Sequence, residues 1–159
     1  MAIGNEIVIS SPYGRKVEGI ISGTPKPGTV MQIKAATAAV GGRLTWEVYN
    51  AAADGDQRLI AVLDIDHLQG KISTDAYVDG QHGFLWVPLP GDELNMLVSA
   101  PGTGTGDAIA IGDLFMVNDG DGLLVDTTGS PESEPFQAIE AVSDVVSTGT
   151  LVACVYTGH

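Results

Sequence analysis

The amino-acid sequence predicts an all-β protein, with a compact barrel-like or sandwich-like domain of short strands, little helix, and an extended N-terminal arm. Three observations lead to this prediction. The apolar runs are short and end at turn residues, the 159 residues include 21 glycines and 8 prolines spread along the chain, and helical periodicity is weak. Many short strands separated by turns are typical of barrels and sandwiches.

The arm is predicted from residues 1–29, "MAIGNEIVISSPYGRKVEGIISGTPKPGT". Two apolar stretches flank "SSPYGRK", and the segment ends in "TPKPG". Proline fixes its own φ angle and pushes the preceding residue toward extended conformations, so this segment should be extended. We therefore expect an arm over residues 1–29 and a β-rich domain over residues 30–159.

The arm has more apolar residues than a solvated tail, and its three bases outnumber its two acids. Either these residues pack on their own domain, or they bind a partner surface, for example by adding a strand to an exposed sheet edge. The residues expected to make such a contact are Ile7, Val8, Ile9, Arg15, Lys16, Val17, Ile20, Ile21 and Lys26.

Strands are expected along the rest of the chain. In residues 44–49, "LTWEVY", the residues Leu44, Trp46 and Val48 alternate with more polar ones, as in a strand with one wet face. Residues 91–100 fit a strand or a short helix capped by Asp92. Residues 126–135 are polar and acidic and should form an exposed loop. Further strands are expected at "RLIAVL" (58–63), "FLWVPL" (84–89), "AIAIGDLFMV" (108–117), "FQAIEAV" (136–142) and "TLVACVY" (150–156).

The last of these strands is apolar on both faces, which predicts a central strand covered on both sides. It contains the single cysteine, Cys154, which we expect to be a buried apolar residue rather than a nucleophile. The chain has no second cysteine for a disulfide.

The charge of the chain is unevenly distributed. The net charge is −13, but the first 71 residues contain seven acids and seven bases, whereas residues 72–159 contain thirteen acids and no lysine or arginine. Binding to nucleic acid is disfavoured, because phosphate contacts need clustered bases. The N-terminus lacks a secretory signal pattern and no apolar run is long enough for a membrane helix, so we expect a soluble protein made in a cytoplasm, without a membrane partner.

Residues 101–125 could suggest a metal or phosphate site. Asp119 and Asp121 have the spacing of two calcium ligands, but the sequence continues as "LLV", without a third ligand or a closing glutamate. Flanking strand sequences favour a hairpin turn instead. The run "PGTGTGD" lacks the lysine and Ser/Thr of a phosphate-binding loop, and no clear helix follows it. We therefore interpret both as loops and expect no metal and no cofactor.

No catalytic constellation is evident, so we do not expect an enzyme. In "LDIDH", Asp64 and Asp66 lie on one face of a strand and His67 on the other. The three histidines lack partners at metal-ligand spacing, and no Gly-x-Ser-x-Gly elbow occurs. "ISTDAYVDG" faintly resembles a stretch of the trimeric dUTP pyrophosphatases, but the phosphate-binding motifs of that family are absent.

Several segments together resemble the small capsid decoration (cement) proteins of tailed bacteriophages: "IISGTPKPGTVMQI", "GGRLTWEVYN", "LQGKISTDAYVDGQ", "VPLPGDELNMLVS" and "AIGDLFMVNDGDGLLV". The resemblance is one of layout, an extended arm followed by a compact β domain. It implies a structural virion protein on the outer surface of the capsid, which binds the major capsid protein, often as a homotrimer, and locks neighbouring coat subunits against the pressure of packaged DNA. The family has no catalytic residues. The two-sided apolar strand at 150–156 would then be a candidate for the seam between copies.

An alternative from a different class stays open. The chain could be a receptor-binding or carbohydrate-binding β domain of a phage fibre, in which exposed Tyr49, Tyr77 or Trp86 forms a stacking platform. The same aromatic residues could instead pack in the core, which the setting of Trp86 in "FLWVP" favours.

Overall fold

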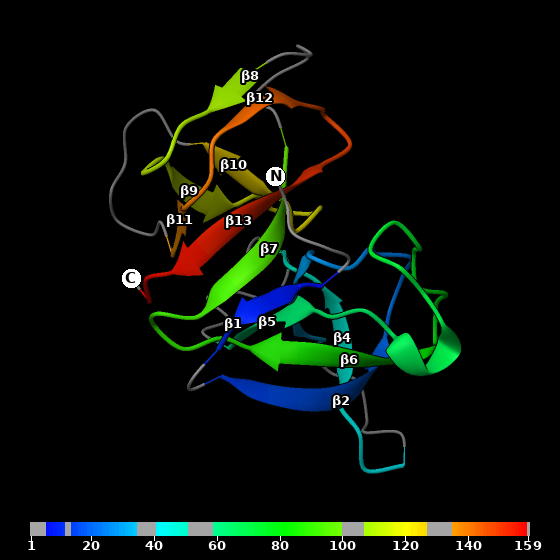
Figure 1. Cartoon of the computed structure of the whole chain (residues 1–159). Helices are drawn as coiled ribbons and strands as arrows, with labels where there is room; N and C mark the ends of the chain where they lie inside the picture. The colour runs from blue at the N-terminus through cyan, green and yellow to red at the C-terminus, as the bar shows by residue number, and fades with distance from the viewer. Residues whose placement is uncertain are drawn as a thin grey trace.

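The computed structural model describes residues 6–11, 14–34, 41–50, 59–99, 107–126 and 135–158. These residues form thirteen β-strands and one short 3₁₀ turn, η1 (His67–Gln69). The all-β prediction is confirmed. The strands form a closed barrel, a second sheet that also curls into a ring, and a two-stranded ribbon (Figure 1).

The first barrel contains β2 (Arg15–Ile21), β3 (Val30–Ile33), β4 (Thr45–Val48), β5 (Ile60–Leu63) and β6 (His82–Val87). The strands close in the order β2-β4-β3-β5-β6, and only the β2–β4 pair is parallel. Every second residue points inward, as the two-residue period of a strand requires. The buried residues inside are Ile21, Met31, Trp46, Ala61, Leu63, Tyr77 and Leu85.

The second sheet contains β1 (Val8–Ser10), β7 (Glu93–Val98), β9 (Leu114–Val117), β10 (Leu124–Asp126), β11 (Phe136–Ala138) and β13 (Thr150–Tyr156). Its order is β1-β7-β10-β9-β11-β13, and β13 also pairs with β7, which closes β7, β10, β9, β11 and β13 into a ring. We call it the curled sheet. The ribbon of β8 (Asp107–Ile109) and β12 (Val142–Val145) lies at one end of it (Figure 1).

The barrel and the curled sheet share one apolar core. Val30 and Val62 lie on the outside of the barrel, yet they are fully buried in the same cluster as Leu94, Met96 and Phe115 of the curled sheet. Main-chain bonds also join the two parts at Gly28. Its N–H donates to the Leu63 carbonyl at 2.8 Å, and its own carbonyl accepts from the Leu97 N–H at 3.1 Å.

Gly28 is required at this junction. Its φ angle is +86°, and an added Cβ would lie 3.0 Å from Leu151 Cδ2 and 3.1 Å from the Asn95 carbonyl oxygen. The close approach of the two parts therefore depends on the missing side chain.

We expected residues 1–29 to form an extended arm separate from the domain, and the described residues of that segment do not do so. Residues 15–21 are β2, which pairs with β6 along its length and with β4 at its end. Ile7 and Ile21 are 0% exposed. Pro25 and Pro27, at the end of the expected arm, are buried. The segment is extended because it is strand, and the described part of residues 1–29 does not form a unit separate from the rest.

Several local predictions are confirmed. β13 is a central strand between β7 and β11, and Cys154 on it is free and fully buried. Burial raises the pKa of the Cys154 thiol well above its ordinary value. Residues 93–98 form a strand rather than a helix. The glycine run at residues 101–106 and most of the acidic loop (residues 127–134) lie outside the described residues.

Candidate interaction surface

The nine residues expected to bind a partner do not form one surface. Val17 and Ile21 point into the first barrel, and Ile7 is buried in the shared core. Val8 packs partly against the same core, and Ile9 is 40% exposed. Lys16 and Ile20 lie on the outside of the barrel, Arg15 is exposed at the start of β2, and Lys26 is exposed on the loop that follows β2.

One edge of β2 is already occupied within the chain, because β2 pairs with β6 from Arg15 to Ile20. On its other edge, β2 pairs with β4 at Ile20 and Ile21. Strand addition by this segment stays a prediction. β2 also presents an outer face. Lys16, Glu18 and Ile20 alternate with the inward residues and lie opposite Trp86, Phe84 and His82 of β6. We call this pair of rows the β2–β6 face.

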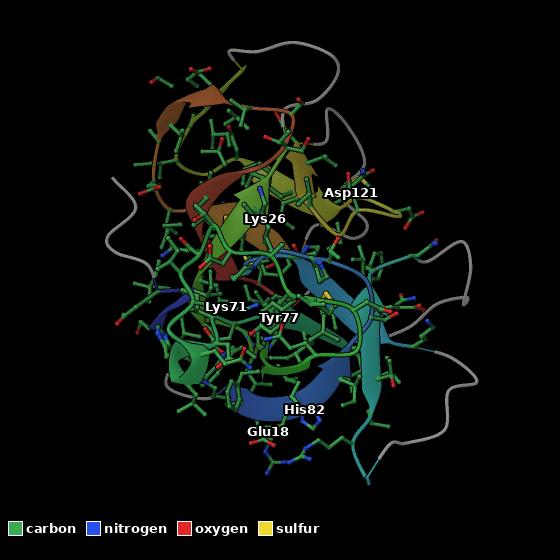
Figure 2. The ribbon with its side chains drawn as sticks, turned by 90° about the vertical axis from the view of Figure 1, so that its right-hand side faces the viewer. Glu18, Lys26, Lys71, Tyr77, His82 and Asp121 are labelled. Carbon is green, nitrogen blue, oxygen red and sulfur yellow. The ribbon has the colours of Figure 1, made fainter. Side chains whose placement is uncertain are left out.

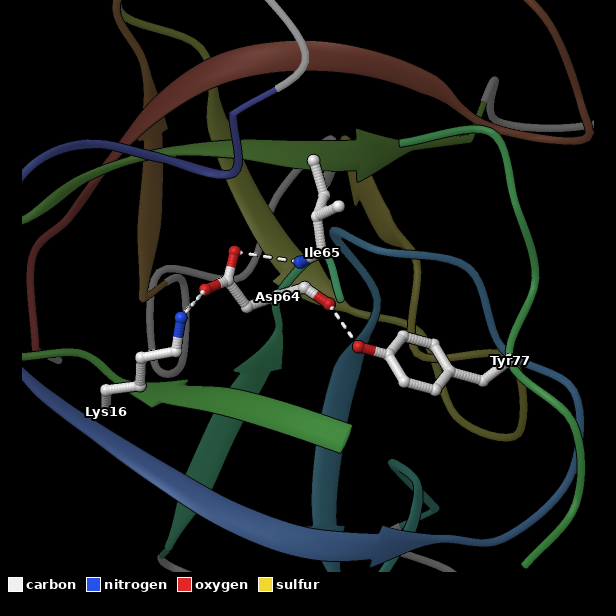
Figure 3. Close-up of polar contacts among 4 residues, drawn as sticks. All are labelled: Lys16, Asp64, Ile65 and Tyr77. Carbon is white, nitrogen blue, oxygen red and sulfur yellow. Dashed lines mark hydrogen bonds and ion pairs between the residues drawn. The ribbon is translucent and has the colours of Figure 1, made fainter. Parts of the chain in front are cut away.

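At one end of the β2–β6 face, Lys16 makes a close ion pair. Its Nζ lies 2.9 Å from Asp64 Oδ2 and 4.6 Å from the centre of the Phe84 ring. Asp64 is largely buried, and its other oxygen accepts the N–H of Ile65 at 2.8 Å. The Asp64 carbonyl accepts the hydroxyl of Tyr77, also at 2.8 Å (Figure 3). Asp64 therefore ties the outside of β2 to the inside of the barrel.

A second ion pair lies beside the first. Arg43 donates from Nη2 and Nε to Glu18 Oε2 at 2.9 and 3.1 Å. Both side chains of this pair are about half exposed, at 42% and 53%. Charged partners thus hold Lys16 and Glu18 in place on the β2–β6 face.

A groove of about 190 Å³ opens between the β2–β6 face and η1. Phe84, His82 and Leu68 line it, together with Glu18 and Gln69. Leu68 is 85% exposed, and Asp66 holds the turn beneath it by accepting the Gln69 N–H at 3.2 Å. Figure 2 shows Glu18 and His82 together at this edge of the barrel. The surface has an apolar centre, Leu68 and Phe84, with ion pairs at its rim.

A second groove, of about 270 Å³, lies where the loop after β2 meets turns of the curled sheet. Lys26, Thr24, Thr29, Asp121 and Leu123 are among its lining residues, and Figure 2 labels Lys26 and Asp121 there. The Asp121 carboxylate is already used locally. It accepts Asn118 Nδ2 at 2.8 Å and the Leu123 N–H at 3.0 Å.

The hairpin prediction for the acidic stretch is therefore confirmed. Residues 119–121 form the turn between β9 and β10, with Gly120 and Gly122 at φ angles of +92° and +63°. Among the described residues, no three His, Cys, Asp or Glu side chains gather as a metal site would require. Asp64 and Asp66 are likewise engaged in the ion pair and the turn described above.

The aromatic stacking platform is not formed by the residues considered for it. Tyr77 is 1% exposed inside the first barrel, and burial raises its phenol pKa well above the ordinary value. Trp86 and Tyr49 are partly buried against the shared core. Trp86 Nε1 donates to Asp92 Oδ2 at 3.3 Å.

Sequence reasoning did not single out Leu68, His82 or Phe84. Alternation in "HGFLWV" could have placed His82, Phe84 and Trp86 on one face of a strand. It could not show that β2 lies opposite that face. Leu68 is exposed because it lies in the short turn capped by Asp66. A turn of this length has no repeating apolar pattern from which the exposure of Leu68 could be predicted.

Within the described ranges, no helix is long and apolar enough to cross a membrane. No protein-family model matches the chain. A search of curated proteins also finds no significant match. Among solved structures, the chain is similar to the head fiber gp8.5 N base of bacteriophage phi29, with a TM-score of 0.53 and 13% sequence identity. The likeness covers 92% of this chain and 96% of the other. At this identity, it shows a shared fold.

Proposed function

We propose that the protein is a structural component of a tailed-phage head, bound to the outer surface of the shell. The observation that carries this proposal is the fold likeness to the phi29 head fiber base, which extends over nearly the whole of both chains. The layout resemblance to capsid decoration proteins points to the same location. A surface suited to docking and no evident catalytic constellation among the described residues are consistent with a structural role.

The β2–β6 face is the part of the molecule we propose to contact the major capsid protein. Phe84 and Leu68 offer apolar area around a groove, and Ile20 lies in the same rows. An apolar centre with a polar rim is the usual anatomy of a protein interface. The described lysines and arginines lie on the barrel strands or on the loops that join them, so this end meets an acidic or neutral shell with less repulsion than the curled sheet would.

The finer proposal is that the bound protein clamps neighbouring coat subunits, as a trimer on the shell. The layout resemblance supports it. The centre of the expected seam at residues 150–156 is covered, because Val152, Ala153 and Cys154 are buried within a single chain, whereas Val155 is only partly buried. Native mass spectrometry of the free and shell-bound protein tests the trimer, and a population of monomers or dimers on shells would refute it.

Binding is tested by co-sedimentation with heads of the encoding phage that lack this protein. Wild-type protein should co-sediment, and Leu68→Asp should reduce binding about tenfold or more, because it puts a charge on the apolar wall of the groove beside the β2–β6 face. Val146→Asp, at a site 36% exposed beyond β12, is the matched control and should bind like wild type.

Two outcomes separate the parts of the proposal. If wild-type protein does not co-sediment and is absent from purified virions, the head location is wrong. If Leu68→Asp binds as well as Val146→Asp, the head location stands and the β2–β6 face is not the contact.

A further inference from the structure

The outer face of the curled sheet carries an apolar strip that no described residue covers. On β9, Phe115 and Val117 point into the sheet, while Leu114 and Met116 point out and are 39% and 37% exposed. This strip lies on a different sheet from the β2–β6 face, so it goes beyond the function proposed above.

Strand register widens the strip across neighbouring strands. Met116 lies opposite Val125 of β10, and Leu114 lies opposite Gln137 of β11. Gln137 in turn lies opposite Val155 of β13. None of these five residues carries a charge. We call them the β9 face.

The turn between β8 and β9 extends this apolar surface. Ile111 in that turn is 70% exposed. Gln137 Nε2 donates to the Gly112 carbonyl at 3.1 Å, which fixes the turn beside the β9 face. Asp113 Oδ2 accepts the Ala110 N–H at 2.7 Å and closes the turn.

The surroundings of the β9 face are acidic. Asp119 and Asp121 are exposed at the hairpin end of β9, and Asp113 directly precedes Leu114 at the other end of the strand. Glu93 of β7 lies opposite Val155 at the other end of the row. From residue 72 to residue 159 the chain has no lysine or arginine, although Lys26 lines the second groove together with Asp121 and offsets part of the charge at the hairpin end.

We propose that the β9 face docks a second protein, whose apolar side chains are ringed by lysine and arginine. An uncharged centre matches the charge-depleted core of interfaces, and the acidic rim favours and steers a basic partner. A second copy of this chain fits less well, because its β9 face would bring another acidic rim against the first. The protein then has two docking ends, a mixed-charge barrel and an acidic sheet.

The test uses three synthetic extended peptides and ¹⁵N-labelled full-length protein. One alternates lysine with valine, a second replaces each lysine by glutamate, and a third replaces each valine by serine. We expect the lysine–valine peptide to shift the amide signals of Leu114, Met116 and Val125. Its affinity should fall about tenfold from ~0.05 to ~0.5 M NaCl, because screening weakens the rim attraction.

Variants check the site. Leu114→Ser with Met116→Ser should weaken binding of the lysine–valine peptide about tenfold, whereas Val78→Ser, at a 64% exposed site on the loop before β6, should leave its affinity unchanged. Signal mapping on the wild type needs no variant, so the test does not depend on how the double variant folds.

Three results overturn the proposal. Equal binding of the lysine–serine peptide means that charge alone acts. Shifts confined to other surfaces place the binding elsewhere. Self-association that strengthens with salt and disappears in Met116→Lys, seen by sedimentation, assigns the β9 face to a second copy.

Discussion

Lys16 Nζ and Asp64 Oδ2 lie 2.9 Å apart and join β2 to the residue that follows β5. The Lys16 side chain is 44% exposed, and that of Asp64 is 9% exposed. The pair links two strands of the barrel electrostatically, from the outer face of β2 to the end of β5. An exposed pair of similar geometry, Arg43 with Glu18, lies nearby and serves as its natural comparison.

Lys16→Met should lower the free energy of unfolding by about 1 to 2 kcal/mol, because it leaves the largely buried Asp64 carboxylate without its cation. Arg43→Met, which breaks the exposed pair, should cost about 0.5 kcal/mol or less. Urea denaturation measures both. A double-mutant cycle with Asp64→Asn isolates the pair. If Lys16→Met and Arg43→Met lowered the free energy of unfolding equally, burial of Asp64 would not make the Lys16–Asp64 pair more stabilising than the exposed pair.

Deleting residues 1–29 should abolish cooperative thermal unfolding, because the deletion removes β2 and opens the first barrel. Ile21→Ala tests the same strand without truncation. It should cost about 2 to 4 kcal/mol, whereas Ile9→Ala, at an exposed site, should cost about 0.5 to 1 kcal/mol. Circular dichroism follows each melt. A truncated protein that melts cooperatively near the wild-type temperature would establish residues 30–159 as an independent domain.

Gly28→Ala should destabilise the protein by about 1 to 3 kcal/mol more than Gly80→Ala. Both glycines have a φ angle near +80°, at +86° and +79°, so both substitutions carry a similar backbone cost. Only at Gly28 does the new Cβ meet other atoms, whereas nothing lies within 4 Å of it at Gly80. The difference between the two variants in denaturant melts therefore measures the close approach of barrel and curled sheet. Equal losses would mean that the junction relaxes freely.

Tyr77 should make stability fall at alkaline pH. Burial raises the pKa of its phenol in the folded protein above the ordinary value of 10.0. Above about pH 10 the unfolded chain loses this proton while the folded protein keeps it, so the free energy of unfolding decreases as pH rises. Tyr77→Phe removes this contribution and also the hydrogen bond to the Asp64 carbonyl, at a cost of about 1 kcal/mol near neutral pH.

The measurement is denaturant unfolding of wild type and Tyr77→Phe between about pH 8 and pH 11. The stability gap between the two proteins should shrink as pH rises above about 10. A gap that stays constant over this range would contradict a buried, neutral Tyr77 phenol.

Strand identity could be predicted from sequence where the two-residue period was clear. Trp46 and Val48 share the inward face of β4, and the two-sided apolar pattern around Cys154 marks a central strand. The turn at Asp121 was also predictable, because its residue types favour positive φ angles whatever lies around them.

The fate of residues 15–21 could not be predicted in the same way. An arm that binds another protein and a strand that pairs within its own chain have the same local sequence pattern. The two cases differ in whether the same chain supplies a strand to pair with. Here it does, because Val17 lies opposite Leu85 of β6, which is far away in the sequence. The candidate surface was hidden for the same reason. Phe84 and Glu18 become neighbours only through that pairing.

The main-chain bonds at Gly28 have a mechanical consequence. Suppose that the barrel is held fixed and a force pulls on the curled sheet. The force is then transmitted through the backbone hydrogen bonds that join Leu63 to Gly28 and Gly28 to Leu97, and through the shared core. At this junction, the described residues join the two parts through hydrogen-bonded main chain and shared side-chain packing. If the barrel is the end bound to the shell, as proposed above, the fold itself sets the orientation of the curled sheet relative to that bound end.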